Sequence, residues 1–394
     1  MPLETQGHAL VLSCLIRNLL KLIEPKSAQG DKSSKTNQSS GRFMKKTLLI
    51  SLLINANVAF NANLAFAQPS IGELLQLHDS IVQISVELEN GNIGTGTGVV
   101  ISNEYVVTNC HVLANGKGAN VAKYGDGFKP IALKADWKHD LCALKFEGLP
   151  FKPVPMRDTA TLEIEEEVFS IGYPNGNNVP QPSYGSIKAK YPFDNGLIIR
   201  SDAAFSLGSS GGALFDQKFN LIGITSFKSP GPQGFFYSLP VEWIKQLITS
   251  KELSSLNTDE SPFWALPYQQ QPYFMQVVIP YQNHEWQNLH QIAQAWTKHE
   301  PNSPDAWFFL GVADWGLSDA ALAKTEFAKA LSFNPKDLDV LIKQSEIALK
   351  EVDFDSLNKL KASIESLDSY ASEELGKKID SLKQQSIKGD APSK

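Results

Sequence analysis

Residues 206–216 have the sequence SLGSSGGALFD, which places the pair Ser209–Ser210 among glycines and ahead of an apolar run. Glycine accepts positive φ and lets neighbouring backbone approach closely, so this cluster predicts a tight turn. Two interpretations compete. The turn either connects two strands and does nothing more, or it is a nucleophile loop in which backbone N–H groups surround a serine hydroxyl. The second interpretation requires a histidine base and an orienting carboxylate elsewhere in the chain.

Both partners are found upstream of this loop. His111 lies in VVTNCHVLAN at the expected end of a strand, and Asp140 lies in WKHDLCALKF at the expected start of another. The order His111, Asp140, Ser210 is one of the few known for acyl-transfer triads. The residues therefore favour the nucleophile loop.

The residues around these motifs have a β pattern from about residue 80 to 240. Short runs rich in Val, Ile, Phe and Tyr alternate with turn signals such as ENGN, GDG and PNGNN. Many short strands at close spacing predict an all-β sandwich or a pair of barrels. The first clear amphipathic helix is expected at VEWIKQLI, residues 241–248.

The segments TNCHV, HDLCAL and SDAAFSLGSSGGAL together resemble the chymotrypsin-like serine peptidases, most closely the HtrA-type branch, over about residues 80–245. This resemblance implies an all-β, trypsin-like double barrel with the active site between the barrels. It implies that Ser210 is the nucleophile, His111 the general base and Asp140 the group that orients the imidazole. The oxyanion hole would be formed by the backbone N–H groups of Gly208 and Ser210.

The resemblance also gives the expected substrate pocket. Ala204 would lie at its base and Thr225, Ser226 and Phe227 along one wall, while Phe236 stands where the branch often has glycine. None of these side chains is charged. We therefore expect a shallow pocket that prefers small apolar residues.

Neighbouring polar residues have simpler interpretations. His139 is left without a role, because a single histidine is more often structural than catalytic. Asp202, in SDAA, is expected to shape the structure or the pocket. Ser209 is set aside because the family motif selects the serine directly before Gly211–Gly212.

The amino-terminal part of the chain predicts export. From Met44 the sequence is MKKTLLISLLINANVAFNANLAFA, with two lysines, an apolar core and a small-residue end at Ala65–Ala67, which is typical of a secretory signal peptide over residues 44–67. Asparagines interrupt the apolar core, so it is too short for a membrane anchor. Residues 1–43 include the polar, low-complexity run GDKSSKTNQSSGR. We expect translation to begin at Met44 and residues 1–43 to be a disordered upstream extension that is not part of the natural protein.

Cleavage after Ala67 would remove Cys14 and leave Cys110 and Cys142. An exported protein meets an oxidising compartment, in which two thiols can pair if their geometry allows it. Since the two cysteines flank the predicted His111–Asp140 pair, a disulfide is one interpretation. Two buried thiols are the other.

Composition divides the mature chain into a protease domain at 68–250, a Pro- and Gln-rich linker at 251–280 and a helical domain at 281–390. The segment 304–335 resembles a tetratricopeptide repeat, in which small residues let paired helices approach. Its matching positions are Trp307, Leu310, Gly311, Ala323, Phe327, Ala330 and Pro335. An ordinary helical bundle is the alternative. Repeats of this kind bind proteins, so a protein partner is expected here besides a polypeptide substrate.

The remaining patterns exclude other functions. Lys and Arg number 36 against 42 Asp and Glu, a net charge of −6 that gives no excess positive charge for nucleic acid. Neither a metal motif nor a phosphate loop is found, since His284, His290 and His299 lack zinc spacing and Gly94–Gly98 lies on a predicted strand. No cofactor and no stable membrane span after signal cleavage are expected.

The sequence thus predicts an exported serine endopeptidase. The alternative is a catalytically silent or partner-activated protein with a protease fold that acts through its helical region. The chain also departs from the HtrA pattern, because no peptide-binding PDZ-like segment follows the protease motifs.

Overall fold

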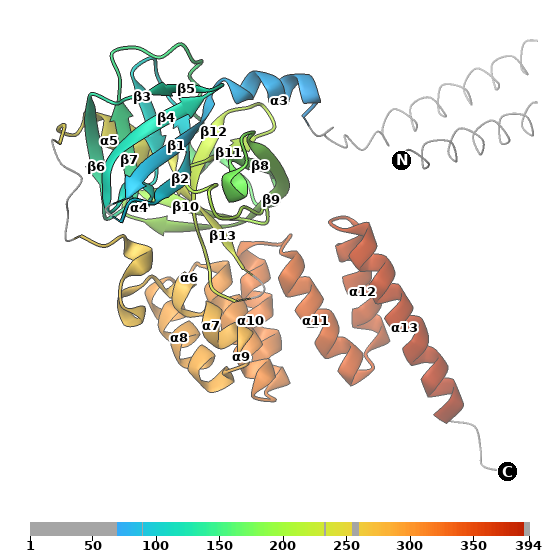
Figure 1. The fold of residues 1–394 in the computed structure, drawn as a ribbon. Coiled ribbons are helices and arrows are strands. Elements are labelled where there is room, and N and C mark those ends of the chain that lie inside the picture. Colours follow the sequence, from blue (N-terminus) through green and yellow to red (C-terminus); the bar gives the residue numbers. More distant parts are fainter. Residues whose placement is uncertain (1–68, 89, 232–233, 254–259, 390–394) are drawn as a thin grey trace, which may run out of the picture. The chain divides into compact units, whose positions relative to one another are not determined.

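The computed structural model describes residues 69–88, 90–231, 234–253 and 260–389. The predicted upstream extension, the signal peptide and Cys14 lie outside these residues. The described chain contains a β region followed by a helical region (Figure 1). Within the described parts, no helix combines the length and the apolar character needed to cross a bilayer.

The first half of the β region is a seven-stranded antiparallel sheet with the order β5-β4-β1-β2-β3-β7-β6. Its strands are β1 (Ile81–Leu88), β2 (Ile93–Val100), β3 (Tyr105–Thr108), β4 (Gly116–Lys123), β5 (Asp126–Phe128), β6 (Ala132–Asp136) and β7 (Leu141–Lys145). Their alternating Val, Ile and Leu side chains form a core of their own. The glycines of GTGTG lie on β2, as predicted.

The second half is a closed six-stranded barrel with the order β10-β13-β12-β11-β8-β9. Its strands are β8 (Glu167–Gly172), β9 (Gln181–Phe193), β10 (Gly196–Ser201), β11 (Ala213–Asp216), β12 (Leu221–Lys228) and β13 (Phe236–Pro240). Two barrel-like β structures in succession agree with the predicted trypsin-like architecture.

Three helices accompany the strands: α3 (Ile71–His78), α4 (Cys110–Leu113) and α5 (Val241–Thr249). The last is the amphipathic helix predicted at 241–248. The expectation that it would be the first helix is wrong, because α3 precedes β1. Ser70 begins α3 with a capping box, in which its hydroxyl and the Glu73 side chain satisfy each other's backbone N–H groups.

The segment after α5 forms short helical elements where the structure describes it. It contains the short 3₁₀ turns η3 (Phe263–Ala265) and η4 (Tyr268–Gln270), then α6 (Tyr273–Gln276) and α7 (Val278–Gln282). Phe263 and Phe274 are buried, at 1% and 5% exposure. They belong to an apolar core that also includes Tyr191 and Tyr237 of the barrel and Trp296 and Phe309 of the helical region.

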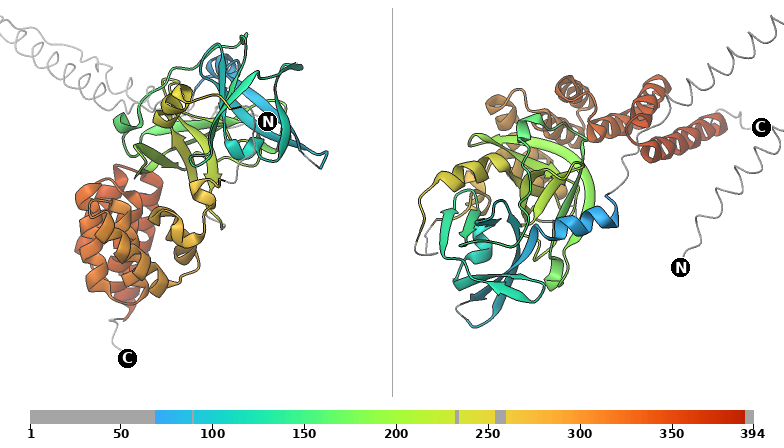
Figure 2. Two further views of the ribbon diagram at one scale, coloured as in Figure 1. Left: turned by 90° about the vertical axis from the view of Figure 1, so that its left-hand side faces the viewer. Right: turned by 90° about the horizontal axis from the view of Figure 1, so that it is seen from above.

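The helical region consists of α8 (Trp286–His299), α9 (Pro304–Gly316), α10 (Ala320–Phe333), α11 (Leu338–Glu351), α12 (Phe354–Glu365) and α13 (Ser369–Gly389). The helices from α8 onward form a group beside the strands in both views of Figure 2. Gly311 on α9 faces Phe327 on α10, where an added Cβ would come within 2.8 Å of the ring. A small residue therefore permits this helix pair, while membership of the tetratricopeptide family stays a prediction.

Candidate active site

His111 and Asp140 are brought together by the pairing of β3 with β7. Thr108 lies opposite Cys142 in this pairing, so α4, which follows β3, stands beside the residue that precedes β7. His111 Nδ1 lies 2.7 Å from Asp140 Oδ2, and the His111 backbone N–H donates to Asp140 Oδ1 at 2.9 Å. A carboxylate at Nδ1 holds the proton on that nitrogen and leaves Nε2 as the acceptor.

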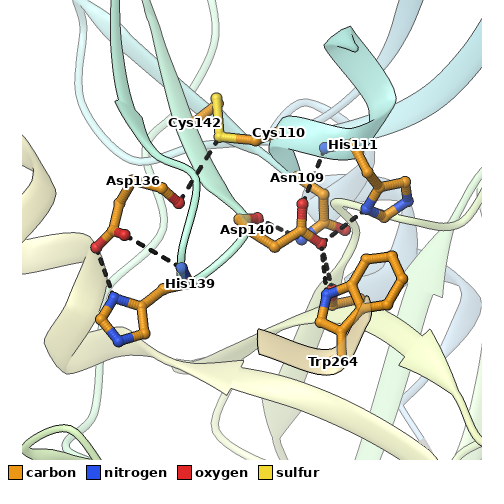
Figure 3. Close-up of a disulfide and its surroundings, with 9 residues drawn as sticks. Asn109, Cys110, His111, Asp136, His139, Asp140, Cys142 and Trp264 are labelled. Atoms are coloured by element: carbon orange, nitrogen blue, oxygen red, sulfur yellow. Dashed lines mark hydrogen bonds and ion pairs between the residues drawn. A yellow bond between two sulfur atoms is a disulfide. The ribbon is translucent and has the colours of Figure 1, made fainter. Parts of the chain in front are cut away.

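The backbone around Asp140 fixes this arrangement (Figure 3). Asp140 has φ of 57°, a left-handed conformation that aspartate tolerates better than most residues. Its carbonyl accepts hydrogen bonds from the backbone N–H of Cys110 at 3.2 Å and from Asn109 Nδ2 at 3.0 Å. A disulfide joins Cys110 to Cys142, with Cα atoms 4.9 Å apart, so α4 and β7 are covalently linked beside the pair.

Asp140 has two further donors that the sequence did not reveal. Ser226 Oγ donates to Oδ2 at 2.7 Å, and Trp264 Nε1 donates to the same oxygen at 3.2 Å. Asp140 is only 1% exposed, so these donors compensate the carboxylate for lost hydration. Ser226 was predicted to be a pocket wall, whereas Trp264 lies in the segment predicted to be a linker and had no local signal.

Ser210 lies in the same groove as His111. The groove has a volume of about 460 Å³ and is lined by Leu88, Asn90, Gly94, Thr95, His111, Val112, Ala114, Asn115, Leu207, Gly208 and Ser210. Among the described residues, the Ser210 hydroxyl bonds with the Ser226 carbonyl at 3.4 Å and not with His111. Hydrogen bonds between catalytic groups often shorten only when substrate binds.

The peptide between Leu207 and Gly208 is held in one orientation. The Leu207 carbonyl accepts from the Asn175 backbone N–H at 2.6 Å, so the Gly208 N–H points the opposite way across the planar peptide. Gly208 has φ of 90°, and its carbonyl accepts from Thr97 Oγ1 at 2.8 Å. Over the described parts of the chain, the N–H groups of Gly208 and Ser210 have no hydrogen-bond acceptor.

A buried lysine supports the loop that holds Leu207. Lys123 Nζ donates to the Ile81 carbonyl and lies 3.3 Å from the Tyr173 hydroxyl. Burial lowers the pKa of Lys123 to about 8 and raises the pKa of Tyr173 to about 12. Both groups face protein atoms, so their role is structural.

A second cavity has a volume of about 280 Å³ and includes two of the five predicted pocket residues in its lining. It is lined by Ser170, Ile171, Gly172, Pro174, Gln181, Pro182, Ser183, Ala204, Phe205, Ser206, Ser209 and Thr225. Ala204 and Thr225 are two of the predicted pocket residues, and none of the lining residues is charged.

Three other predicted pocket residues lie outside this lining. Ser226 turns to Asp140 instead. Phe227 is buried, stacked on Tyr237 at 4.7 Å and on Trp264 at 5.7 Å. The Phe236 ring lies 5.2 Å from that of Phe205, which does line the cavity. Ser226 and Phe227 were expected to line the pocket because they follow Thr225 on the same strand, but their side chains pack against Asp140, Tyr237 and Trp264 instead.

The polar residues that were set aside have structural partners. His139 Nδ1 lies 2.7 Å from Asp136 and its ring packs 4.1 Å from Trp243. Asp202 accepts from the Ser186 backbone N–H. His290 bonds with Asp314, and the residues that the structure describes contain no cluster able to hold a metal ion.

Comparison with known proteins gives a family for the β region. Residues 96–224 match the family model described as "Trypsin-like peptidase domain". The chain contains a trypsin-like peptidase domain. Its match includes His111, Asp140 and Ser210.

The curated proteins that this domain resembles include serine endoproteases. The chain is 32% identical over 157 residues to a "Probable periplasmic serine endoprotease DegP-like" of Pseudomonas putida, covering 37% of this chain and 32% of that protein. It is 34% identical over 173 residues to the protein of that name in Rickettsia prowazekii, covering 40% and 33%. The chain thus spans about a third of the length of these curated relatives.

Solved structures give similar matches. "HtrA-type protease AlgW with tripeptide" is 26% identical with a TM-score of 0.42, covering 46% of this chain and 63% of the other. The active form of the Rv3671c protease from M. tuberculosis is 21% identical with a TM-score of 0.43, covering 47% and 87%.

Proposed function

We propose that this protein is an exported serine endopeptidase that cleaves polypeptides through an acyl-enzyme intermediate. The observation that carries the proposal is that one groove is lined by Ser210, by Gly208 and by His111, whose imidazole is paired with the buried Asp140. The backbone N–H groups of Gly208 and Ser210 have no acceptor among the described residues. A nucleophile, an oriented base and oxyanion donors are the parts that acyl transfer requires.

Each group then has a defined task. Ser210 Oγ attacks the substrate carbonyl and His111 Nε2 takes its proton, which later passes to the leaving amine. Asp140 keeps the proton on Nδ1 and stabilises the imidazolium. The N–H groups of Gly208 and Ser210 hold the oxyanion, and each such donor is worth ~3 kcal/mol of barrier.

The uncharged cavity beside Ser209 and Thr225 supports a preference for an uncharged residue before the cleaved bond. We take this cavity as the pocket for that residue, named P1. Because Ala204 lies in its lining and the rings of Phe205 and Phe236 pack together beside it, small apolar P1 side chains fit best.

Relatives named as periplasmic endoproteases, together with the predicted signal peptide at 44–67, support export to the periplasm. The paired helices after residue 285 support a second task, the binding of a protein partner or of substrate. Among the described residues, the Ser210 hydroxyl bonds with the Ser226 carbonyl and not with His111. This leaves one competing function, a protease fold that is catalytically silent or activated by a partner.

Labelling with a fluorophosphonate probe separates these functions. The mature chain, residues 68–394, should react at Ser210, and Ser210→Ala should abolish the labelling while Ser209→Ala should keep it. A folded protein that does not react would support the silent or partner-activated function. Labelling that survives in Ser210→Ala would contradict the assignment of the nucleophile.

A further inference from the structure

The segment that carries Trp264 is fixed on both sides. Before it, Phe263 donates its backbone N–H to the Lys138 carbonyl at 3.0 Å and is buried against Phe193 and Trp243. After it, Gln271 Nε2 donates to the carbonyls of Trp264 and Leu266 at 3.1 and 2.9 Å. The backbone that carries the indole is therefore held in place by contacts before and after Trp264.

The indole is in contact with the predicted base and its carboxylate (Figure 3). Its Nε1–H donates to Asp140 Oδ2 at 3.2 Å. Its ring stands edge-on to the imidazole of His111, with centroids 5.4 Å apart and planes at 88°. The indole is also nearly parallel to the ring of Phe227, with centroids 5.7 Å apart and planes at 22°.

The turn that carries Asp140 explains why a distant side chain is needed. Strand β6 ends at Asp136 and β7 begins at Leu141, so the turn has only four residues. Such a turn cannot fold back over its own carboxylate. Trp264, 124 positions further along the chain, supplies the cover and the hydrogen bond.

The position of the indole also indicates on which side of the cleaved bond Trp264 lies. Phe227 and Ser226 follow Thr225 on β12, and Thr225 lines the cavity proposed for P1. The groove with Leu207 and Val112 extends from His111 without contacting Trp264. Trp264 consequently lies on the acyl side of the cleaved bond, beside the place of the residue before P1, named P2.

We propose that Trp264 is a positioning and specificity residue of the active site. Its Nε1–H orients the Asp140 carboxylate and, through it, His111, while its ring walls the P2 subsite and restricts it to small side chains. This inference rests on the proposed peptidase function.

Two variants separate the two roles. Trp264→Phe keeps a ring but removes the donor, and we expect kcat to fall about tenfold with little change in KM, because a hydrogen bond to a buried carboxylate is lost. Trp264→Ala removes both the ring and the donor, and the ratio of kcat/KM for a P2-Leu peptide over a P2-Ala peptide should rise about tenfold or more.

Internally quenched peptides identical except at P2 are the substrates. Trp307→Phe, whose indole donates to the Pro301 carbonyl on the helical region, is the matched control and should keep both values.

Two readouts do not depend on turnover. Proton NMR should show a downfield resonance for His111 Nδ1–H, which moves in Trp264→Phe and stays in Trp307→Phe. Affinities of the two peptides for Ser210→Ala protein should differ, and Trp264→Ala should remove the difference. If the wild-type chain takes no fluorophosphonate, the peptidase function fails while these readouts still decide the role of Trp264.

Unchanged kcat and an unchanged proton resonance in Trp264→Phe would overturn the positioning role. A Trp264→Ala protein that cleaves both peptides faster, with the same P2 ratio, would overturn the subsite. That result would mean that the indole only restricts access of substrate to the groove.

Discussion

The proposed catalytic role of Gly208 depends on its backbone conformation. Its φ of 90° is strained for any side chain, and an added Cβ would lie 2.4 Å from the Tyr173 carbonyl oxygen. We predict that Gly208→Ala displaces the peptide that carries one oxyanion donor, and lowers kcat/KM by about 100-fold or more. Hydrolysis of a quenched peptide measures this.

Gly125 is a matched control, because its φ is 92° and no atom lies within 4 Å of an added Cβ. Gly125→Ala introduces the same backbone strain without the clash. It should cost about 1 kcal/mol of stability and keep the wild-type rate. Equal rates for the two variants would show that the Gly208 peptide has no part in catalysis.

At the scale of elements, α9 and α10 bring two buried carboxyl groups, those of Asp314 and Glu326, close to each other. Burial, and next to it the neighbouring Asp314, raise the pKa of Glu326 to about 8. Burial likewise raises the pKa of Asp337, before α11, to about 7. A carboxyl with a raised pKa in the folded state stabilises it fully below the unfolded value near 4.5, and this stabilisation is lost as pH rises through the folded pKa.

We therefore predict that the helices lose stability, on the order of a few kcal/mol, between pH 5 and pH 9. Glu326→Gln should remove about half of this slope, with the other half coming from Asp337. Urea unfolding followed by circular dichroism at several pH values gives the measurement, and Glu365→Gln on α12 is the control. A slope as steep in Glu326→Gln as in the wild type would refute the assignment.

At the scale of the whole molecule, the sequence could predict the features that depend on local pattern. It could not predict those that depend on packing between distant segments. The strands, the α5 helix and the order of His111, Asp140 and Ser210 follow from local alternation and motif context. Helix α3 was missed although its capping box, Ser70 to Glu73, is a readable signal. Trp264 could not be found, because its contact with Asp140 depends on how the segment after α5 packs against the β region.

The barrel and α9 also share a buried polar contact. The Tyr191 hydroxyl donates to Asp305 Oδ2, and Arg200 Nη2 lies 3.8 Å from the same oxygen. All three residues are at most 7% exposed, and the Tyr191 ring stacks on Phe274 at 4.3 Å. The helical region is thus fastened to the barrel through the same segment that brings Trp264 to the active site.

Asp305→Ala tests whether this contact joins the two regions into one folding unit. The change leaves the buried Arg200 without its carboxylate, which we expect to cost about 3–5 kcal/mol. The wild-type helices and active site should unfold together in urea, with helix content followed by circular dichroism and the active site by fluorophosphonate labelling. In Asp305→Ala the helices should be lost at a lower urea concentration than the labelling, whereas Asp355→Ala on the exposed start of α12 should keep the two transitions coincident. Coincident transitions at the wild-type midpoint in Asp305→Ala would mean that apolar packing alone holds the helical region to the barrel.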